Sequence, residues 1–411
     1  MTIGSFSVLL KLVGGSLCLL LFASFPIPTP ATAGIHRITV VWTIGDNIPG
    51  ACANQVSPKD AVIPVDGANL ESRWRAAINQ GRSSAAGKSF WVAYQFPIRP
   101  GYRIDGSDCV FGRVSDSAGN TSEGRNGSEI HNAGVFLHYS HDRTAIQRAQ
   151  IYSLDRKHDF AGQPVYWLGS IESDESLLFL RGLIDSKQSE AVARDCVTAI
   201  GLHDAPRAAQ ILKEYTAASY AEQIRSTAVF WVGRYPGMVP FLDGFARDEA
   251  NGLELRKQAV FSIGSGDDDA AFPALESLYT SVHSSELKKQ VVFAVSINRS
   301  TDAAVSFLID SAHREPDREV RKTAIFWLGQ KAGDRSLKAL GDVVNDNDED
   351  TEVKKQAVFA LSQRPKDEAI PILIKIARTH PNGEVRKQAI FWLGQTGDER
   401  ATAFFEEILR N

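Results

Sequence analysis

The sequence has few cysteines and no excess of charge of either sign. It contains 4 cysteines in 411 residues, too few for a disulfide-scaffolded fold, and no Cys-x-x-Cys pair that would indicate a zinc site. Its 45 basic and 49 acidic residues give a formal net charge of −4, so composition gives no reason to expect nucleic acid as a partner. With 43% hydrophobic and 23% charged residues, the chain is neither disordered nor collagen-like.

Sequence motifs of catalysis are also missing. There is no Gly-x-Ser-x-Gly nucleophile elbow, phosphate-binding loop, Gly-x-Gly-x-x-Gly turn or His-Glu-x-x-His helix. The nearest candidate is a histidine cluster made of His131, His138 and His141, with Asp142 beside it. The stretch before His138 reads as a strand, which turns residues three apart to opposite faces. We therefore favour surface histidines over a metal site, and we expect no cofactor.

Residues 1–33 differ in composition from the rest of the chain and have the parts of a secretory signal peptide. Lys11 precedes an apolar run over residues 12–25, and Ala31-Thr32-Ala33 supplies a small-x-small cleavage site. As a helix, the run would reach about 21 Å, short of the ~30 Å hydrocarbon core of a bilayer. An uncleaved membrane anchor is the alternative. We expect a mature chain that starts at Gly34, has no membrane span, and resides in the periplasm or outside the cell.

Self-similarity organises the second part of the chain, in which one unit occurs eight times. The stretch from Val385 to Gly394 recurs upstream at a spacing of 31–33 residues. Clear copies begin at Ile224, Leu255, Leu287, Val320 and Val353, and weaker copies at Phe160 and Val192. A glutamate precedes five of the starts, position 10 is Gly or Ser as a helix stop, and a second apolar-periodic segment follows. Neither helix can bury its apolar stripe alone, so this pattern predicts a mainly α fold, an α-solenoid of about eight helix pairs.

The repeated pattern Val-Arg-x-x-Ala-x-x-x-Leu-Gly, with a turn and an Ala-x-x-x-Leu helix after it, resembles HEAT-like repeats. The similarity is greatest to the short type first associated with phycobilin lyases, and it covers residues 155–411. Because HEAT-like arrays mostly serve as protein-binding scaffolds, the resemblance implies a protein or peptide partner. It also implies an alternative, a phycobilin-lyase-like enzyme or chromophore-handling protein, although an export signal points away from bilin attachment in the cytoplasm.

Two residue types recur at positions that the packing of the repeat does not require. At about 100° per residue, positions 1, 5 and 9 form the packed stripe, and positions 3 and 7 lie nearly opposite to it. Position 7 is aromatic in almost every unit, and position 3 is lysine in the last five. The candidate partner-binding residues are therefore Phe230, Phe261, Phe293, Phe326, Phe359, Phe391, Lys257, Lys289, Lys322, Lys355 and Lys387.

These residues have two interpretations. In HEAT-like arrays the helix that carries them lines the concave face, where rows of Phe and Lys would form a groove for an extended, somewhat acidic peptide or protein segment. Alternatively, the rings pack on one another and on lysine stems between adjacent helices. The functional hypothesis is an exported, non-enzymatic interaction scaffold that uses the groove.

Other recurring residues are interpreted as structural. We expect the position-2 cations to pair with carboxylates of the turns, and the position-8 tryptophans to lie in the core; these are Trp167, Trp231, Trp327 and Trp392. The acidic run over residues 345–350 lacks the glycine and final-glutamate spacing of an EF-hand, which favours a solvated turn over a calcium loop.

Residues 34–150 are interpreted as a small β-rich domain ahead of the solenoid. β-like runs cover residues 38–43, 90–96, 135–139 and 149–154, residues 71–79 are compatible with one short helix, and residues 112–128 are interpreted as a long loop. This domain would cap the array, and an enzyme housed in it is a third functional alternative.

The cysteines can be assigned within this organisation. Cys18 leaves with the signal peptide, and in an oxidising compartment Cys52 and Cys109 could pair inside the N-terminal domain. Such a disulfide would close a loop of about 57 residues and stabilise the fold by ~3–4 kcal/mol. Cys196 occupies a small-residue position of the repeat, so we expect a buried side chain there.

Overall fold

A computed structural model describes residues 62–84, 89–100, 132–140, 145–154, 158–186, 188–347 and 349–410. It also gives the backbone of the strands β1 (Leu9–Val13), β2 (Ser16–Leu20), β3 (Trp42–Thr43), β6 (Tyr102–Asp105) and β7 (Val110–Arg113). The signal cleavage site, Cys52, Cys109 and most of the predicted loop lie outside the described residues. The chain divides into two units, residues 1–232 and 233–411, and each has its own description below.

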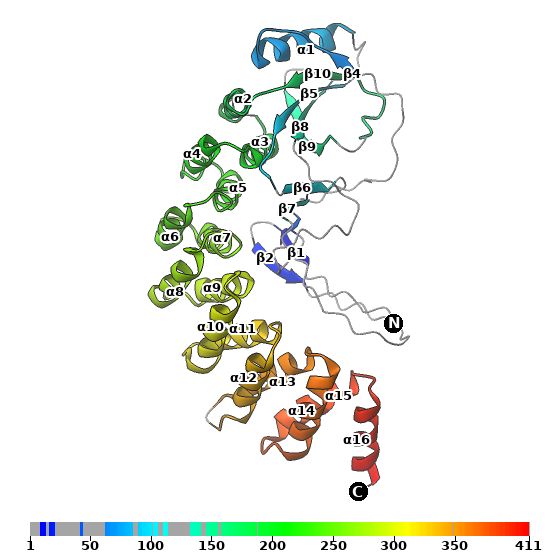
Figure 1. The fold of residues 1–411 in the computed structure, drawn as a ribbon, viewed down its shortest axis with the longest axis vertical. Helices are drawn as coiled ribbons and strands as arrows, with labels where there is room; N and C mark the ends of the chain where they lie inside the picture. The colour runs from blue at the N-terminus through cyan, green and yellow to red at the C-terminus, as the bar shows by residue number, and fades with distance from the viewer. Residues whose placement is uncertain are drawn as a thin grey trace. The chain divides into compact units, whose positions relative to one another are not determined.

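The first unit contains a five-stranded mixed sheet (Figure 1). Its strands are β4 (Val62–Pro64), β5 (Phe90–Pro97), β8 (Asn132–Tyr139), β9 (Ile146–Ser153) and β10 (Val165–Ser170). The order is β4-β10-β5-β8-β9, with β10 parallel to β4 and β5, and with antiparallel pairing from β5 through β8 to β9. Helix α1 (Leu70–Ser84) connects β4 to β5. The predicted strands at 90–96, 135–139 and 149–154 and the helix at 71–79 are confirmed.

Four more helices complete the first unit: α2 (Ser173–Asp185), α3 (Glu190–Leu202), α4 (Pro206–Glu214) and α5 (Glu222–Val232). The central strand β5 has apolar residues on both faces. Its Phe90 ring packs on Gly81 of α1, and its Phe96 ring stacks on His203, which follows α3, at 4.1 Å between centroids. The opposite face of β5 carries Trp91, whose ring lies 4.5 Å from the ring of His138 on β8.

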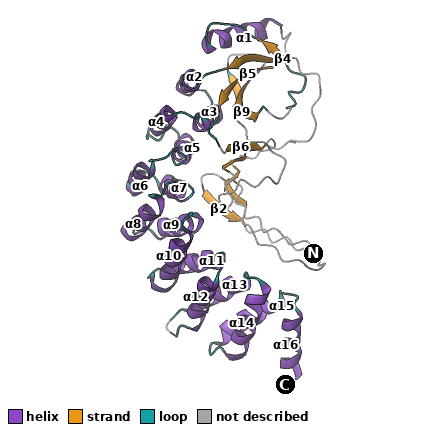
Figure 2. Ribbon diagram, viewed as in Figure 1, coloured by secondary structure: helices purple, strands orange, loops and turns teal. Residues whose placement is uncertain are grey.

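The second unit is built from helices in two rows (Figure 2). The first row is α7 (Leu253–Gly264), α9 (Ser285–Ile297), α11 (Arg318–Gly329), α13 (Thr351–Ser362) and α15 (Gly383–Gly394), each packed on the next. The second row is α6 (Val239–Arg247), α8 (Ala271–Ser281), α10 (Thr301–Arg314), α12 (Asp334–Asn345), α14 (Lys366–Thr379) and α16 (Glu399–Arg410). The apolar core lies between the rows, with residues such as Leu308, Val320 and Leu340 fully buried. The predicted fold class, a mainly α HEAT-like solenoid that follows a small sheet region in the sequence, is confirmed.

The weak repeat copy that starts at Phe160 is not a helix, and that part of the prediction is wrong. Residues 165–170 form strand β10, between β4 and β5 in the sheet. Pro164 occupies position 5 of the copy, where its missing N–H and its ring would break a helix. Ala161 and Gly162 have φ values of 54° and 71°, which no right-handed helix contains. Trp167 of this copy is consequently a half-buried residue of the sheet and not part of the helical core.

Helices α7, α11, α13 and α15 end at position 10, as predicted, and the glycine there also has a packing role. Gly264 and Gly329 end their helices without the positive φ of a left-handed cap, and the residues after them are in the right-handed region. A Cβ on Gly264 would lie 2.5 Å from the carbonyl oxygen of Ala294 on α9. A Cβ on Gly329 would lie 2.8 Å from the Cβ of Ala360 on α13. In α7 and α11, position 10 is therefore small because the next helix of the row touches it.

The acidic residues of the turns cap helices and bind cations, as expected for structural turns. Asp317 and Asp350 accept hydrogen bonds from the first backbone N–H groups of α11 and α13. Asp350 belongs to the acidic run over residues 345–350, and its neighbour Glu349 lies 3.0 Å from Arg321. Described residues of the run thus serve the fold as a cap and an ion pair.

Position-2 cations bind the turns in two ways. Lys288 and Arg321 form the predicted ion pairs with turn carboxylates, Glu315 and Glu349 respectively, both at 3.0 Å. Arginines at this position also donate to backbone carbonyl oxygens near the end of the preceding helix. These bonds join Arg225 to Thr216, Arg256 to Ala246, Arg321 to Glu315 and Arg386 to His380. The carbonyls that a helix end leaves without partners are satisfied in this way.

Candidate protein-interaction surface

The predicted partner-binding residues of the second unit all lie on the first row of helices. Positions 3 and 7 of each repeat point away from the core, because positions 1, 5 and 9 face it; Val385, Ala389 and Leu393 of α15 are all buried. Phe230 belongs to α5 of the first unit and is half-buried, with its ring 5.3 Å from that of Trp231. The predicted partner-binding residues are therefore divided between the two units.

The aromatic rings at position 7 pack on one another along the row. Phe261 and Phe293 are stacked with 6.2 Å between centroids and 8° between planes, and Phe326 and Phe359 are stacked at 6.5 Å and 12°. A tryptophan at position 8 fills the space next to the preceding repeat, as Trp327 does at 5.0 Å from Phe293. At the beginning of the row the rings are thus packed between adjacent helices, as in the second interpretation. Phe261 and Phe293 are only 7% and 6% exposed there.

Exposure of these rings increases toward the C-terminal end. Phe326 and Phe359 are half-buried, and Phe391 is 54% exposed. Trp392 contacts both Phe359 and Phe391, at 5.1 and 5.0 Å between centroids. We refer to Phe326, Trp327, Phe359, Phe391 and Trp392 as the C-terminal aromatic surface. Its phenylalanines belong to the predicted site, and another molecule could contact them without unfolding the array. Its tryptophans, predicted to lie in the core, are only half-buried.

Each lysine of the predicted cationic stripe has a glutamate partner in its own helix. The pairs are Lys257–Glu254 at 3.0 Å, Lys289–Glu286 at 2.6 Å, Lys322–Glu319 at 3.3 Å, Lys355–Glu352 at 3.0 Å and Lys387–Glu384 at 2.7 Å. The hydrogen bond and charge of Lys387 hold the pKa of Glu384 below its usual range. The stripe is accordingly a row of ion pairs without net charge. The i, i+3 spacing of Glu and Lys is visible in the sequence, but a glutamate at that place also suits a helix start, which is the only role expected of it from the sequence.

The predicted histidine cluster is only partly described. His138 lies on β8 with its Nε2 3.1 Å from Oε1 of Gln163, while His131, His141 and Asp142 lie outside the described residues. Burial lowers the pKa of His138 and outweighs the opposing hydrogen bond from Gln163. Within the described residues, no group of three or more His, Cys, Asp or Glu side chains is placed to hold a metal ion.

A buried polar network joins the sheet to the helices of the first unit, and sequence reasoning missed it. Nδ1 of His203 lies 2.7 Å from the carbonyl oxygen of Ala199, which can only accept, so this nitrogen carries the proton. Nε2 then accepts from the hydroxyl of Ser176 at 2.8 Å, and Tyr94 lies 2.9 Å from the same hydroxyl. Burial lowers the pKa of His203 to about 4. Cys196 on the neighbouring α3 is buried as predicted, and burial raises the pKa of its thiol.

Sequence comparison places HEAT repeats in the last part of the chain. The family model described as HEAT repeats matches residues 337–411, which span α12 to α16 apart from the first residues of α12. A comparison with curated proteins found no match. In the described part of the chain, no helix has both the length and the apolar character needed to cross a bilayer.

Several solved structures are similar to parts of this chain. They include YibA of Escherichia coli (16% identity, TM-score 0.34, covering 58% of this chain and 89% of that one). Human deoxyhypusine hydroxylase in complex with glycerol has 17% identity and a TM-score of 0.28, covering 57% of this chain and 89% of that one. The CpcE–CpcF complex of phycocyanin lyase from Nostoc has 16% identity and a TM-score of 0.28, covering 38% of this chain and 97% of that one. With TM-scores this low, none of their activities is transferred to this chain.

Proposed function

We propose that this protein is an exported interaction scaffold whose HEAT-like array binds a protein or an extended peptide through the C-terminal aromatic surface. The observation that carries the proposal is the change in burial along one row of equivalent side chains. Phe293 is closed off by Trp327 of the next repeat, whereas Phe391 stands open on α15. An open aromatic surface beside polar residues is typical of interaction sites in soluble proteins.

The geometry supports an extended apolar segment as the partner. Rings that are already stacked or wedged against a tryptophan lose little conformational freedom on binding, so they serve as preorganised anchors. The flanking lysines are paired with glutamates at 2.7–3.3 Å over α11, α13 and α15, so the surface offers donors and acceptors in alternation. This pattern fits a partner segment that has an apolar centre flanked by groups of both charges. The sequence alone favoured an acidic segment.

Export is the second part of the proposal and rests on residues 1–33. The charged start, the apolar run and Ala31-Thr32-Ala33 together support cleavage before Gly34. Fractionation of the native cells, followed by N-terminal sequencing, tests this part alone. We expect the periplasm or the medium to contain a chain that begins at Gly34; a full-length chain in the cytoplasm would contradict export.

Site-specific photo-cross-linking tests the binding surface. A photoreactive amino acid replaces Lys322 or Lys355 of the first row in two variants, and Lys338 or Asp342 of α12 in two matched controls. Because all four positions are at least partly exposed, the fold should tolerate each replacement. In the native compartment we expect the same polypeptide to be cross-linked from both first-row positions and from neither control. Cross-linking from α12 alone, or none from any position, would refute the proposed surface.

A further inference from the structure

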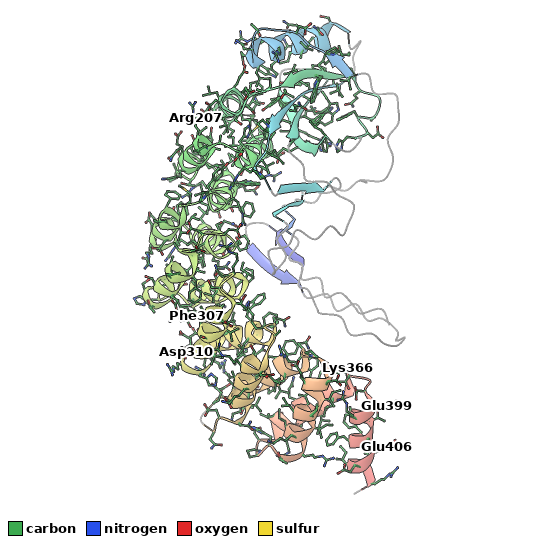
Figure 3. All side chains as sticks on the ribbon, viewed as in Figure 1. Arg207, Phe307, Asp310, Lys366, Glu399 and Glu406 are labelled. Atoms are coloured by element: carbon green, nitrogen blue, oxygen red, sulfur yellow. The ribbon has the colours of Figure 1, made fainter. Side chains whose placement is uncertain are left out.

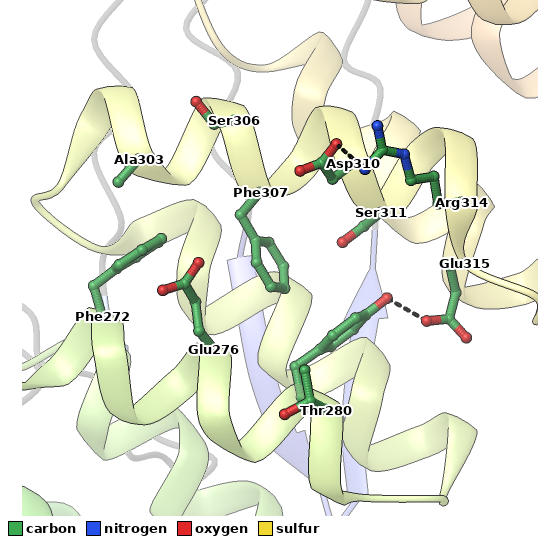
Figure 4. A pocket seen from close by; sticks show the side chains of 11 residues that line it. Phe272, Glu276, Thr280, Ala303, Ser306, Phe307, Asp310, Ser311, Arg314 and Glu315 are labelled. Atoms are coloured by element: carbon green, nitrogen blue, oxygen red, sulfur yellow. Dashed lines mark hydrogen bonds and ion pairs between the residues drawn. The ribbon is translucent and has the colours of Figure 1, made fainter.

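A cleft on the second row of helices has a lining suited to a ligand of its own. It lies between α8 and α10 (Figure 4) and has a volume of about 420 Å³, and none of its lining residues belongs to the C-terminal aromatic surface. Figure 3 places Phe307 and Asp310, two of its lining residues, on α10. The volume falls in the lower part of the ~300–1,000 Å³ range of small-ligand sites.

The walls of the cleft are aromatic. Phe272 and Tyr279 come from α8, and Phe307 comes from α10, with Tyr279 and Phe307 in edge-to-face contact at 4.9 Å and 74°. All three rings are half-buried, so each keeps part of its surface open. In the next two helices of the row, the half-buried residues packed against the core are the aliphatic Leu337, Ile372 and Ile374. The rings that line the space between α8 and α10 thus have no counterpart in α12 or α14.

The rim of the cleft is acidic. Among the lining residues, Glu276, Asp310 and Glu315 are acidic, and the basic Arg314 pairs with Asp310 at 3.5 Å. Glu315 is already engaged, since it accepts from Tyr279 at 2.6 Å and from Lys288 at 3.0 Å. Glu276 is exposed, and its carboxylate forms no hydrogen bond or ion pair with the side chain of any described residue. Figure 4 shows its carboxylate between the rings of Phe272 and Phe307 in projection.

Open aromatic faces and an unengaged carboxylate in one cleft are complementary to an organic cation. A cation over an aromatic ring is attracted by the ring's quadrupole, and the planar guanidinium of arginine can stack on a ring while it pairs with a carboxylate. We propose that this cleft binds an arginine side chain presented by a protein partner, with Glu276 as the charge partner and Phe272 and Phe307 as the stacking walls. This site is independent of the aromatic surface on the first row, and either one can fail in experiment without the other.

A pair of peptides that differ in charge but not in shape tests the proposal. The full chain is titrated with acetyl-Gly-Arg-Gly-amide and with acetyl-Gly-citrulline-Gly-amide, and binding is followed by saturation-transfer NMR of the peptides. Citrulline has the length and planarity of arginine without its charge, so the arginine peptide should bind at least about five times more tightly. Added salt should weaken the binding of the arginine peptide only.

Two variants and a control assign the site. Glu276→Gln keeps the shape of the cleft and should weaken the arginine peptide about three- to tenfold, whereas Glu249→Gln, an exposed control in the turn before α7, should leave it unchanged. Phe307→Leu keeps an apolar wall and should weaken binding about threefold. No binding of the arginine peptide, equal binding of both peptides, or identical behaviour of Glu276→Gln and Glu249→Gln would overturn the assignment.

Discussion

Replacing one glycine by alanine tests the close packing of the first row. Gly264 ends α7, and its missing side chain leaves room for Ala294 of α9. A Cβ at this position would lie 2.5 Å from the carbonyl oxygen, 2.6 Å from the Cβ and 2.7 Å from the Cα of Ala294. Two of these atoms belong to the backbone of a helix, so the clash can be relieved only if α7 and α9 move apart.

The expected cost follows from the size of the clash. Forcing an extra carbon into a packed interior costs about 1–3 kcal/mol, and the lower backbone entropy of unfolded alanine returns about 0.4–1 kcal/mol. Gly264→Ala should therefore destabilise the second unit by about 1–2 kcal/mol. Gly244→Ala is the matched control, because Gly244 lies inside α6 and a Cβ there would meet nothing within 4 Å. That substitution should stabilise the unit by about 0.5–1 kcal/mol.

Urea unfolding followed by far-ultraviolet circular dichroism compares the two variants with the parent. Hydrogen–deuterium exchange localises the effect, since a repeat array need not unfold in a single step. Faster exchange in α7 and α9 of Gly264→Ala is the expected result. If both substitutions raised the stability, Gly264 would be only a helix stop, and the account of the row would be refuted.

Three further predictions follow from buried or capping residues. The pKa of His203 is about 4 when folded against about 6.5 when unfolded, so the unfolded chain takes up its proton first as pH falls. Neutral His203 therefore contributes about 3 kcal/mol to the free energy of unfolding above pH ~6.5, and this contribution is lost as pH falls toward ~4. Urea unfolding across this range should show the loss, and the His203→Gln variant should show a weaker dependence of stability on pH. In the same measurement, Phe293→Ala should lower the free energy of unfolding by about 3–5 kcal/mol and Phe391→Ala by less than about 1 kcal/mol. Equal losses would contradict the increase in exposure along the first row. Asp317→Ala removes the cap of α11 and should cost about 1 kcal/mol, with faster exchange in the first turn of that helix as its signature.

Local periodicity was sufficient to predict the array. The copies that begin at Val192, Ile224 and later each lie on a helix, because their apolar spacing matches one stripe of a helix and a polar cap precedes many of them. The sequence also contains the reason why the copy that starts at Phe160 does not form a helix. Pro164 disfavours a helix in the Phe160 copy, and the aromatic and β-branched residues of β10 suit a largely buried strand.

Properties that depend on the neighbouring helix could not be read from one repeat. Phe293 and Phe391 occupy the same position of the same pattern, yet one is covered by a tryptophan of the next repeat and the other is open. The contact of Tyr94 and His203 with Ser176 joins residues far apart in the chain, and no local pattern announces it. The acidic, aromatic cleft was missed for the same reason, since its walls come from two helices of different repeats.

The central claim is that the C-terminal aromatic surface binds the partner. Hydrogen–deuterium exchange of the full chain, alone and with the polypeptide recovered by cross-linking from Lys322 and Lys355, tests it most directly. We predict slower exchange over α11, α13 and α15, with α12, α14 and the sheet residues of the first unit unchanged. Protection confined to the sheet or to the second row would contradict the claim.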